Sequence, residues 1–236
     1  MRIVIEALEE SSLIQKIILS EPLINSQSAR SAVITAEKMG IPILKVSENV
    51  FKVLSNREGP QGLAAVLKMD FKELSNFQKN LEGIWIALYQ VADPGNLGTI
   101  LRTLDGMGGA GMILIDHCTD PYDPTSIRAS MGSIFNKTIL KSSSEYFEKW
   151  VKITNTVVIG TSDSAKKDYL DYSYPNDLIL LMGSEREGIP VKMKENCHNI
   201  ISIPMLGKSD SLNLAVASSV ILYEIFNQRR KQKEKR

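Results

Sequence analysis

The chain has 236 residues, of which 43% are hydrophobic and 23% charged, and its formal net charge is +1. This composition is typical of a globular protein with a substantial core, and no apolar run reaches the roughly 18 residues that a membrane-spanning helix needs. The first residues are too acidic for a secretory signal, and two cysteines, Cys118 and Cys197, are too few for a disulfide framework. We therefore expect a cytoplasmic protein without membrane contact.

Residues 1–70 mix short apolar runs with polar helical segments, from RIVIEAL to LAAVLKM. This pattern predicts a small α/β domain, in which GPQG forms a turn before the last strand. Residues 71–82 are polar and have no strong apolar stripe. They are predicted to form a linker.

From residue 83 to 236 the pattern becomes regular. Five apolar runs of strand length, most of them separated by helical segments, are GIWIALYQV, GMILIDH, TVVIGTS, LILLMGS and NIISIPM. Such runs predict a parallel sheet that is buried on both faces. A final helix with an apolar face ends in a basic tail, QRRKQKEKR. The tail either attracts phosphates or is a solvated helix end whose cations suit the helix dipole.

The first polar feature at a strand end is VADPGNLGTILRT. DPGN predicts a turn, with Asn96 placed to cap the following helix. Leu97, Ile100, Leu101 and Leu104 predict a buried stripe, and Arg102 falls on the opposite face. By itself the segment is consistent with a capped helix and an exposed arginine. It also starts at the carboxyl end of a strand, where open α/β sheets bind ligands.

Two further loops follow apolar strands. In LILLMGSEREGIP, Gly183 and Gly188 allow the backbone to approach a ligand, and the carboxylates could accept hydrogen bonds from a sugar or an amine. In ISIPMLGKSDSLNLAV, Ser211 or Asn213 opens the last helix, and the apolar strand end beside an amphiphilic loop could hold a purine. A solvated turn and an ordinary helix cap are the alternatives for the two loops.

Other chemistries find little support in the sequence. The pairs His117-Cys118 and Cys197-His198 lack the spacing of metal ligands, and neither histidine has a context that favours a Ser–His–Asp triad. No GxGxxG follows any strand, which argues against a dinucleotide-binding oxidoreductase. We expect no metal.

Taken together and in this order, NLGTILRT, GSEREG and IPMLGKSDSLNLAVASSVILYE resemble the three motifs of the SpoU/TrmH family, the RNA ribose 2′-O-methyltransferases of the SPOUT superfamily. SIRASMGSIF and GPQGLAAV are similar to two further family elements. The resemblance covers about residues 84–226. It implies an α/β fold with a parallel-sheet SPOUT domain, a deep trefoil knot, S-adenosylmethionine bound in the knot, and a homodimer. Knots are rare in proteins, and nothing in the periodicity predicts this one.

The resemblance also assigns site residues. Cofactor contacts, largely through backbone atoms, fall on Gly183, Ile203 and Leu212, and the lining of the same pocket on Thr161, Met182 and Met205. RNA binding and catalysis fall on Asn96, Arg102, Glu185, Ser211 and Asn213.

Roles for these polar residues follow from their chemistry. Because an arginine stays protonated, we expect Arg102 to grip the phosphate beside the target ribose bidentately and to polarise the hydroxyl. Asn96 and Glu185 are expected to hold Arg102 and the site in register. Ser211 and Asn213 are expected to order the cofactor loop.

The sequence departs from the family pattern at two places. The second motif often contains G-N-E, whereas this chain has Gly183-Ser184-Glu185, so a hydroxyl replaces an amide. RIVIEAL stands where the family has EG..LV.EAL, so the small domain is expected to lack its first strand and basic lead-in. This departure concerns substrate recognition more than catalysis.

The expected function is methyl transfer from S-adenosylmethionine to a ribose 2′-hydroxyl in structured RNA. Ribosomal RNA is preferred over transfer RNA, because a domain with PQG is common in family members that act there. Two alternatives stay open: a tRNA ribose or base methyltransferase of the same fold, and a non-catalytic RNA-binding assembly factor.

Overall fold

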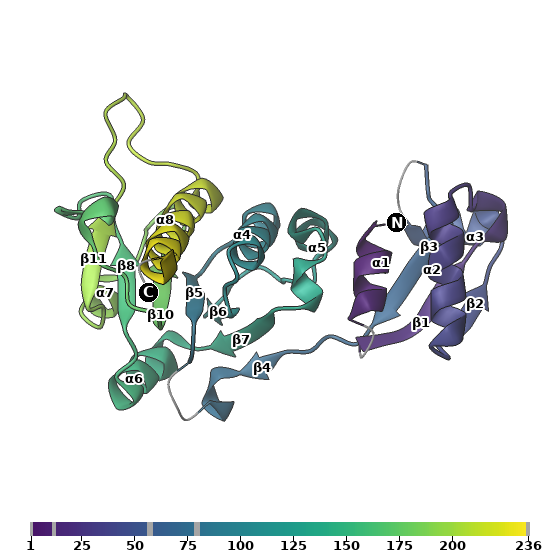
Figure 1. The fold of residues 1–236 in the computed structure, drawn as a ribbon, viewed down its shortest axis with the longest axis horizontal. Coiled ribbons are helices and arrows are strands. Elements are labelled where there is room, and N and C mark those ends of the chain that lie inside the picture. The colour runs from purple at the N-terminus through teal and green to yellow at the C-terminus, as the bar shows by residue number, and fades with distance from the viewer. Residues whose placement is uncertain (1, 11–12, 56–58, 78–80, 235–236) are drawn as a thin grey trace. The chain divides into compact units, whose positions relative to one another are not determined.

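The computed structural model describes residues 2–10, 13–55, 59–77 and 81–234. The chain divides into two compact units, residues 1–70 and 71–236 (Figure 1). Each unit is described by itself.

The smaller unit is an α/β layer around a three-stranded sheet with the order β2-β1-β3 in the described residues. The central strand runs parallel to β2 and antiparallel to β3. Apolar side chains from two helices and from the sheet form its core, with Ile17 fully buried. That this unit lacks a first strand stays a prediction. Its elements are α1 (Arg2–Glu9), β1 (Ile14–Leu19), α2 (Gln27–Lys38), β2 (Ile43–Lys45), α3 (Glu48–Ser55) and β3 (Leu63–Leu67).

The larger unit contains an eight-stranded sheet, counted over the described residues, with the order β4-β7-β6-β5-β10-β8-β11-β9. Every paired neighbour in it is parallel, so the predicted parallel sheet and α/β class are confirmed. The knot stays a prediction. The strands are β4 (Lys72–Glu73), β5 (Ile84–Tyr89), β6 (Gly111–Ile115), β7 (Thr138–Ser142), β8 (Val158–Thr161), β9 (Lys167–Asp168), β10 (Leu178–Met182) and β11 (Asn199–Ser202).

Helices cover both faces of this sheet (Figure 1). Alternate side chains of a strand point to opposite faces: Ile86 and Leu88 of β5 join one core, and Trp85 and Ala87 join the other. The first core includes side chains of α4, α5 and α8, and the second includes those of α6 and α7. The helices are α4 (Pro94–Gly106), α5 (Pro124–Ser130), α6 (Ser144–Thr154), α7 (Val191–Lys194) and α8 (Leu214–Glu234).

Part of the predicted linker, residues 71–82, belongs to the larger unit. Strand β4 pairs with β7, and Leu74 in the short 3₁₀ helix Leu74–Asn76 is fully buried. Leu81, also in this segment, is buried as well. The segment is polar overall, so two buried leucines gave little sign of this anchoring in the sequence. Residues 78–80 lie outside the described part of the chain.

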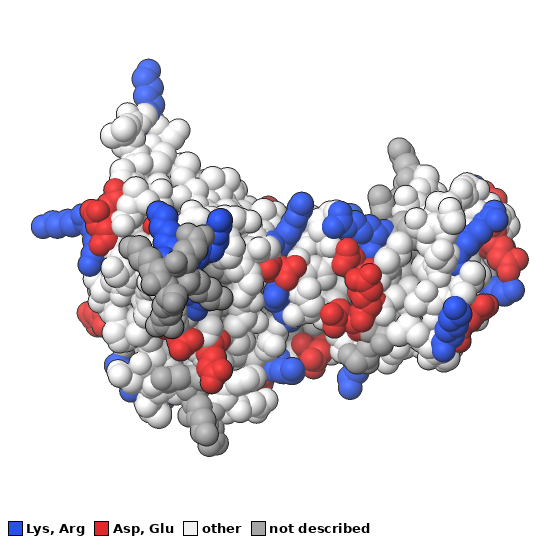
Figure 2. Space-filling view, viewed as in Figure 1, with Lys and Arg blue, Asp and Glu red and all other residues white. Residues whose placement is uncertain are grey.

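The basic tail continues α8 as far as Glu234. One of its cations is engaged within the fold, because the Arg229 guanidinium donates a hydrogen bond to the backbone carbonyl of Asn176. On the face shown in Figure 2, basic and acidic side chains are intermixed rather than gathered into a single area of one sign. Residues 235–236 of the tail lie outside the described chain.

Candidate active site

The loop after β5 turns directly into α4. Asp93 is the N-cap of this helix, and its carboxylate accepts a hydrogen bond from the Asn96 backbone N–H at 2.6 Å. The prediction that Asn96 caps α4 is therefore wrong: Asp93, three residues earlier, does so, and Pro94 begins the helix. The Asn96 side chain is consequently available for contacts with other loops. Arg102 is exposed, as the helical pattern predicts.

The four apolar side chains of the predicted stripe on α4 are fully buried: Leu97, Ile100, Leu101 and Leu104. Close packing against α5 also depends on Gly98. A β-carbon at this position would lie 2.3 Å from the carbonyl oxygen of Ser126 and 2.7 Å from the Ala129 side chain. The first motif thus combines a buried helix face with a close helix–helix approach.

The loop after β10 folds back on itself. The backbones of Ser184 and Gly188 exchange two hydrogen bonds, at 3.3 and 3.1 Å, and the Ser184 hydroxyl accepts a third from the Glu187 N–H at 3.2 Å. A β-carbon on Gly183 would lie only 2.0 Å from the backbone carbon of Gly188. The hydroxyl at position 184 therefore stabilises the turn that presents Glu185.

Three side chains from three separate segments, the first turn of α4, the loop after β10 and the start of α8, form one hydrogen-bonded chain. The Asn213 carboxamide oxygen caps α8 by accepting from the N–H groups of Ala215 and Val216 at 2.9 and 3.3 Å. Its amide nitrogen donates to Asn96 Oδ1 at 3.0 Å. Asn96 in turn donates from Nδ2 to Glu185 Oε1 at 3.2 Å.

The direction of this chain is fixed from one end to the other. A carboxamide has one accepting and one donating side, so the helix cap decides that Asn213 donates to Asn96. The same logic then decides that Asn96 donates to Glu185. The residues lie 117 and 89 positions apart in sequence. The side chains are thus pre-oriented only when all three segments are in place.

Beside this chain lies a cavity of about 540 Å³ at the carboxyl ends of β8 and β10. All six predicted cofactor-contacting residues line it, and so do three of the five predicted catalytic ones: Gly183, Ile203, Leu212, Thr161, Met182 and Met205, then Glu185, Ser211 and Asn213. Asn96 reaches the wall through its two hydrogen bonds.

Arg102 is not part of the cavity wall. It lies six residues beyond Asn96, which corresponds to about 9 Å along the axis of α4. Within the described residues it has no hydrogen bond or ion pair, and neither Asn96 nor Glu185 contacts it in this way. The expectation that these two residues hold Arg102 in register therefore has no counterpart among the described contacts.

The sequence reasoning missed several residues of the cavity wall. Apolar side chains that belong to the buried core also line it: Ile189, Ile201, Leu214, Ala217 and Ile221. Ser162 and Asp163, which follow β8, and Lys194 of α7 add a second polar group. The two loop residues could have been suspected because they follow an apolar strand in a parallel sheet, but Lys194 had no such signal.

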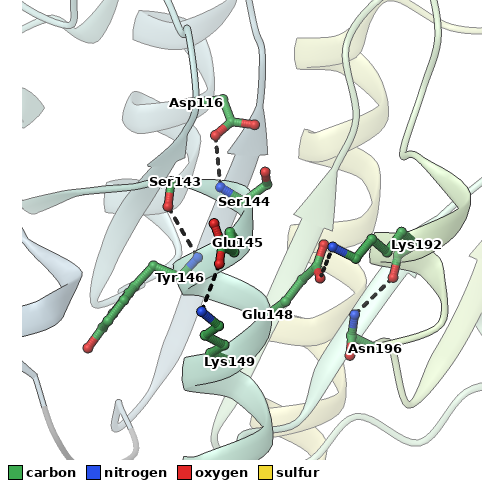
Figure 3. A network of polar contacts seen from close by, with 9 residues as sticks. All are labelled: Asp116, Ser143, Ser144, Glu145, Tyr146, Glu148, Lys149, Lys192 and Asn196. Carbon is green, nitrogen blue, oxygen red and sulfur yellow. Dashed lines mark hydrogen bonds and ion pairs between the residues drawn. The ribbon is translucent and has the colours of Figure 1, made fainter.

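Helix α7 is held to α6 on the side shown in Figure 3. Lys192 forms an ion pair with Glu148 of α6 at 3.3 Å, and the Asn196 amide donates to the Lys192 carbonyl at 2.8 Å. Glu148 is buried, whereas the side chain of Lys192 is 73% exposed. This pair links α6 to α7, the helix from which Lys194 lines the cavity.

No metal centre is present in the part of the chain that is described, since no three His, Cys, Asp or Glu side chains gather in it. Burial raises the pKa of the Cys197 thiol to about 12, so this sulfur is not a thiolate at neutral pH. The described helices include none that is long and apolar enough to cross a membrane.

Two protein families match this chain. The family described as SpoU rRNA methylase matches residues 83–223, and the family described as RNA 2′-O ribose methyltransferase substrate binding matches residues 1–72. The chain belongs to the SpoU rRNA methylase family. The resemblance inferred from the three motifs is therefore confirmed, and both matches together span nearly the whole chain.

Two similar proteins are named as methyltransferases of 23S rRNA. A 23S rRNA (uridine(2479)-2′-O)-methyltransferase from Streptomyces viridochromogenes is 33% identical over 73% of this chain, and the match spans 62% of that protein. A 23S rRNA (guanosine(2553)-2′-O)-methyltransferase from Bacillus subtilis is 28% identical over 79% of this chain and 73% of its own length. An AdoMet-bound rRNA methyltransferase from Sinorhizobium meliloti superposes with a TM-score of 0.84 at 31% identity, covering 98% and 85% of the two chains.

Proposed function

We propose that this protein transfers a methyl group from S-adenosylmethionine to a ribose 2′-hydroxyl of structured RNA, with ribosomal RNA preferred over transfer RNA. The observation that carries the proposal is the chain Asn213–Asn96–Glu185, which joins the first motif to the wall of a cavity lined by the loops of the second and third motifs. Membership of the SpoU family supports the same reaction class.

The cavity fits the chemistry of this cofactor. Its volume of about 540 Å³ lies within the usual range for small-molecule sites. Apolar side chains such as Ile203 and Ile201 suit a purine, and polar groups at the edges suit a ribose and a charged amino-acid tail. When bound, S-adenosylmethionine supplies an electrophilic methyl group on a sulfonium.

The protein's part in such a reaction is mainly positioning. Glu185, held by Asn96, presents a carboxylate at the cavity, where it can accept a hydrogen bond from the reacting hydroxyl or from the cofactor. Asn213 fixes the start of α8 and thereby the end of the loop that contains Ser211 and Leu212. These residues order the site around the reacting groups.

Arg102 is assigned to the RNA. Its guanidinium is exposed and has no ion pair among the described residues, so it is available to bind a phosphate bidentately. Gripping the phosphate next to the target ribose would align the hydroxyl with the methyl group. Because arginine does not give up its proton, this role does not require it to act as a base.

We extend the proposal to a homodimer. Helix α8 presents Val216 and Tyr223, which are 49% and 46% exposed, beside α4, to which it is joined by the Thr103–Ser219 hydroxyl contact at 3.0 Å. Exposed apolar side chains on one face indicate an interaction surface. Light scattering is expected to give twice the chain mass, and Val216→Glu is expected to give the monomer mass.

The reaction is tested with purified protein and S-adenosylmethionine labelled in the methyl group. Ribosomal RNA and transfer RNA from cells that lack the gene are separate substrates. We expect labelling of ribosomal RNA at one position that resists alkaline cleavage, because a methylated 2′-oxygen cannot attack the neighbouring phosphate. An RNA-modifying role of this kind would place the protein in the cytoplasm. Labelling of transfer RNA alone would show that transfer RNA, and not ribosomal RNA, is the substrate. Label on a base would show that the ribose 2′-hydroxyl is not the methylated group.

A further inference from the structure

The cavity has a second polar end, away from the Asn96–Glu185 contact. The Lys194 ammonium lies 3.4 Å from the Ser162 hydroxyl, and this hydroxyl lies 3.3 Å from a carboxylate oxygen of Asp163. All three residues line the cavity. This group, Ser162, Asp163 and Lys194, is called the β8 end of the cavity.

The strand order separates the two ends. Asn96 follows β5 and Glu185 follows β10, whereas Ser162 follows β8, and the sheet has the order β5-β10-β8. Neighbouring strands lie about 4.8 Å apart, so the ends of β5 and β8 are roughly 10 Å apart. If the methyl group reacts beside Asn96 and Glu185, the β8 end faces the nucleoside part of the cofactor rather than its sulfonium. This step rests on the proposed function.

The two lysines of α7, Lys192 and Lys194, lie on different sides of the helix and in different surroundings. The Lys192 side chain points toward Glu148 of α6, with which it forms an ion pair, and is 73% exposed (Figure 3). Lys194 is two residues later, which turns it about 200° around the helix axis. It is partly buried, lines the cavity, and has no ion pair among the described residues.

We propose that Lys194 is a cofactor-binding residue that donates hydrogen bonds to acceptor atoms of the cofactor's nucleoside, its ribose oxygens or adenine ring nitrogens. An ammonium has three donors and no acceptor. The contact to Ser162 is long for a hydrogen bond and uses only one of them. Lys194 lines the cavity, so its remaining donors can reach a bound nucleoside, whose ribose oxygens and ring nitrogens are acceptors. The ammonium also lies at the end of the cavity remote from the positive sulfonium. Repulsion between the two cations is weaker there than it would be beside the sulfonium.

The test is a calorimetric titration with two ligands, S-adenosylhomocysteine and 5′-methylthioadenosine, the second of which lacks the amino-acid tail. Lys194→Met is compared with Lys192→Met, the same substitution on the outer side of α7. We expect Lys194→Met to weaken both ligands about tenfold, the loss typical of a charge-assisted hydrogen bond. Lys192→Met should bind both within about twofold of the unaltered protein, and Lys194→Arg should restore most of the affinity.

Several results would overturn the proposal. If Lys194→Met loses affinity for S-adenosylhomocysteine but not for 5′-methylthioadenosine, Lys194 recognises the amino-acid tail. Unchanged affinity for both ligands would show that the ammonium contacts neither. If the unaltered protein binds neither ligand, the proposed function itself fails. Thermal melting of each variant separates these results from misfolding.

Discussion

The two polar ends of the cavity are built in different ways. The Asn213–Asn96–Glu185 chain joins side chains that are 117 and 89 residues apart, whereas two members of the β8 end, Ser162 and Asp163, are neighbours in sequence. The Asn213–Asn96–Glu185 chain is the first end, and each of its two amides both accepts and donates a hydrogen bond, which fixes its orientation. The β8 end has one long contact and a lysine with donors to spare. We infer that the first end fixes reaction geometry and that the second adjusts affinity.

The largest effect should come from a change that affects both ends. Gly183→Ala would place a β-carbon 2.0 Å from the backbone of Gly188 and 2.3 Å from that of Ile189, so the loop has to move. We expect about a hundredfold or greater loss of S-adenosylhomocysteine affinity, measured by calorimetry, and loss of methyl transfer. Gly207→Ala is the matched control, since a β-carbon there meets nothing within 4 Å. Wild-type affinity in Gly183→Ala would contradict the proposed role of this loop.

Arg102→Ala should separate RNA alignment from cofactor binding. Loss of the guanidinium is expected to lower the single-turnover rate of methyl transfer about 10²- to 10³-fold, while cofactor affinity stays within a fewfold, because Arg102 does not line the cavity. Arg102→Lys keeps the charge without the planar fork and should recover only part of the rate. A strong loss of cofactor affinity would rule out a role confined to RNA.

Asn96→Asp changes a single group in the Asn213–Asn96–Glu185 chain. The new carboxylate cannot donate to Glu185, and it sets two negative charges side by side where a 3.2 Å hydrogen bond stood. We expect about a tenfold to hundredfold lower rate, with 5′-methylthioadenosine affinity within about threefold. Asn227→Asp, on an exposed part of α8, adds the same charge away from the cavity. Equal losses in rate and in nucleoside affinity would mean that the two ends of the cavity do not act independently on catalysis and on binding.

The smallest effect concerns the outer side of α7. Lys192→Met leaves the buried Glu148 carboxylate without its cation, so we expect unfolding free energy to fall by about 1 kcal/mol, or roughly 2–4 °C in Tm. Lys149→Met removes the exposed pair with Glu145 on the same helix (Figure 3) and should lower the unfolding free energy by less than Lys192→Met does, because solvent screens an exposed pair. Equal melting shifts would contradict the different burial of the two pairs.

The sequence predicted most of the larger sheet because five of its strands are continuous apolar runs. It missed β7, whose segment TILKS contains a lysine, and it missed β4 and β9, which are two residues long. Periodicity is weak in such segments, and their pairing is decided by neighbouring strands. The buried stripe on α4 was predicted because every member faces one side of a helix.

The candidate site was predicted as a set of residues but not as a geometry. Asp93 and Asn96 are both good capping residues, and only the fold decides that Asp93 caps α4 while Asn96 reaches across to two other loops. Lys194 was missed because a lysine in a polar segment resembles a solvated side chain. Its burial follows from the position of α7 against the cavity, which no local pattern encodes.

The most direct test of the central claim is the chemical position of the transferred methyl group. Ribosomal RNA and, in a separate sample, transfer RNA from cells lacking the gene are each incubated with the protein and S-adenosylmethionine deuterated in the methyl group. Each RNA is then digested to nucleosides and analysed by mass spectrometry. We predict that the deuterated methyl is found on one 2′-O-methylnucleoside, and that Arg102→Ala nearly abolishes it. Deuterium found only on a nucleobase, or absent from both ribosomal and transfer RNA, would contradict the account.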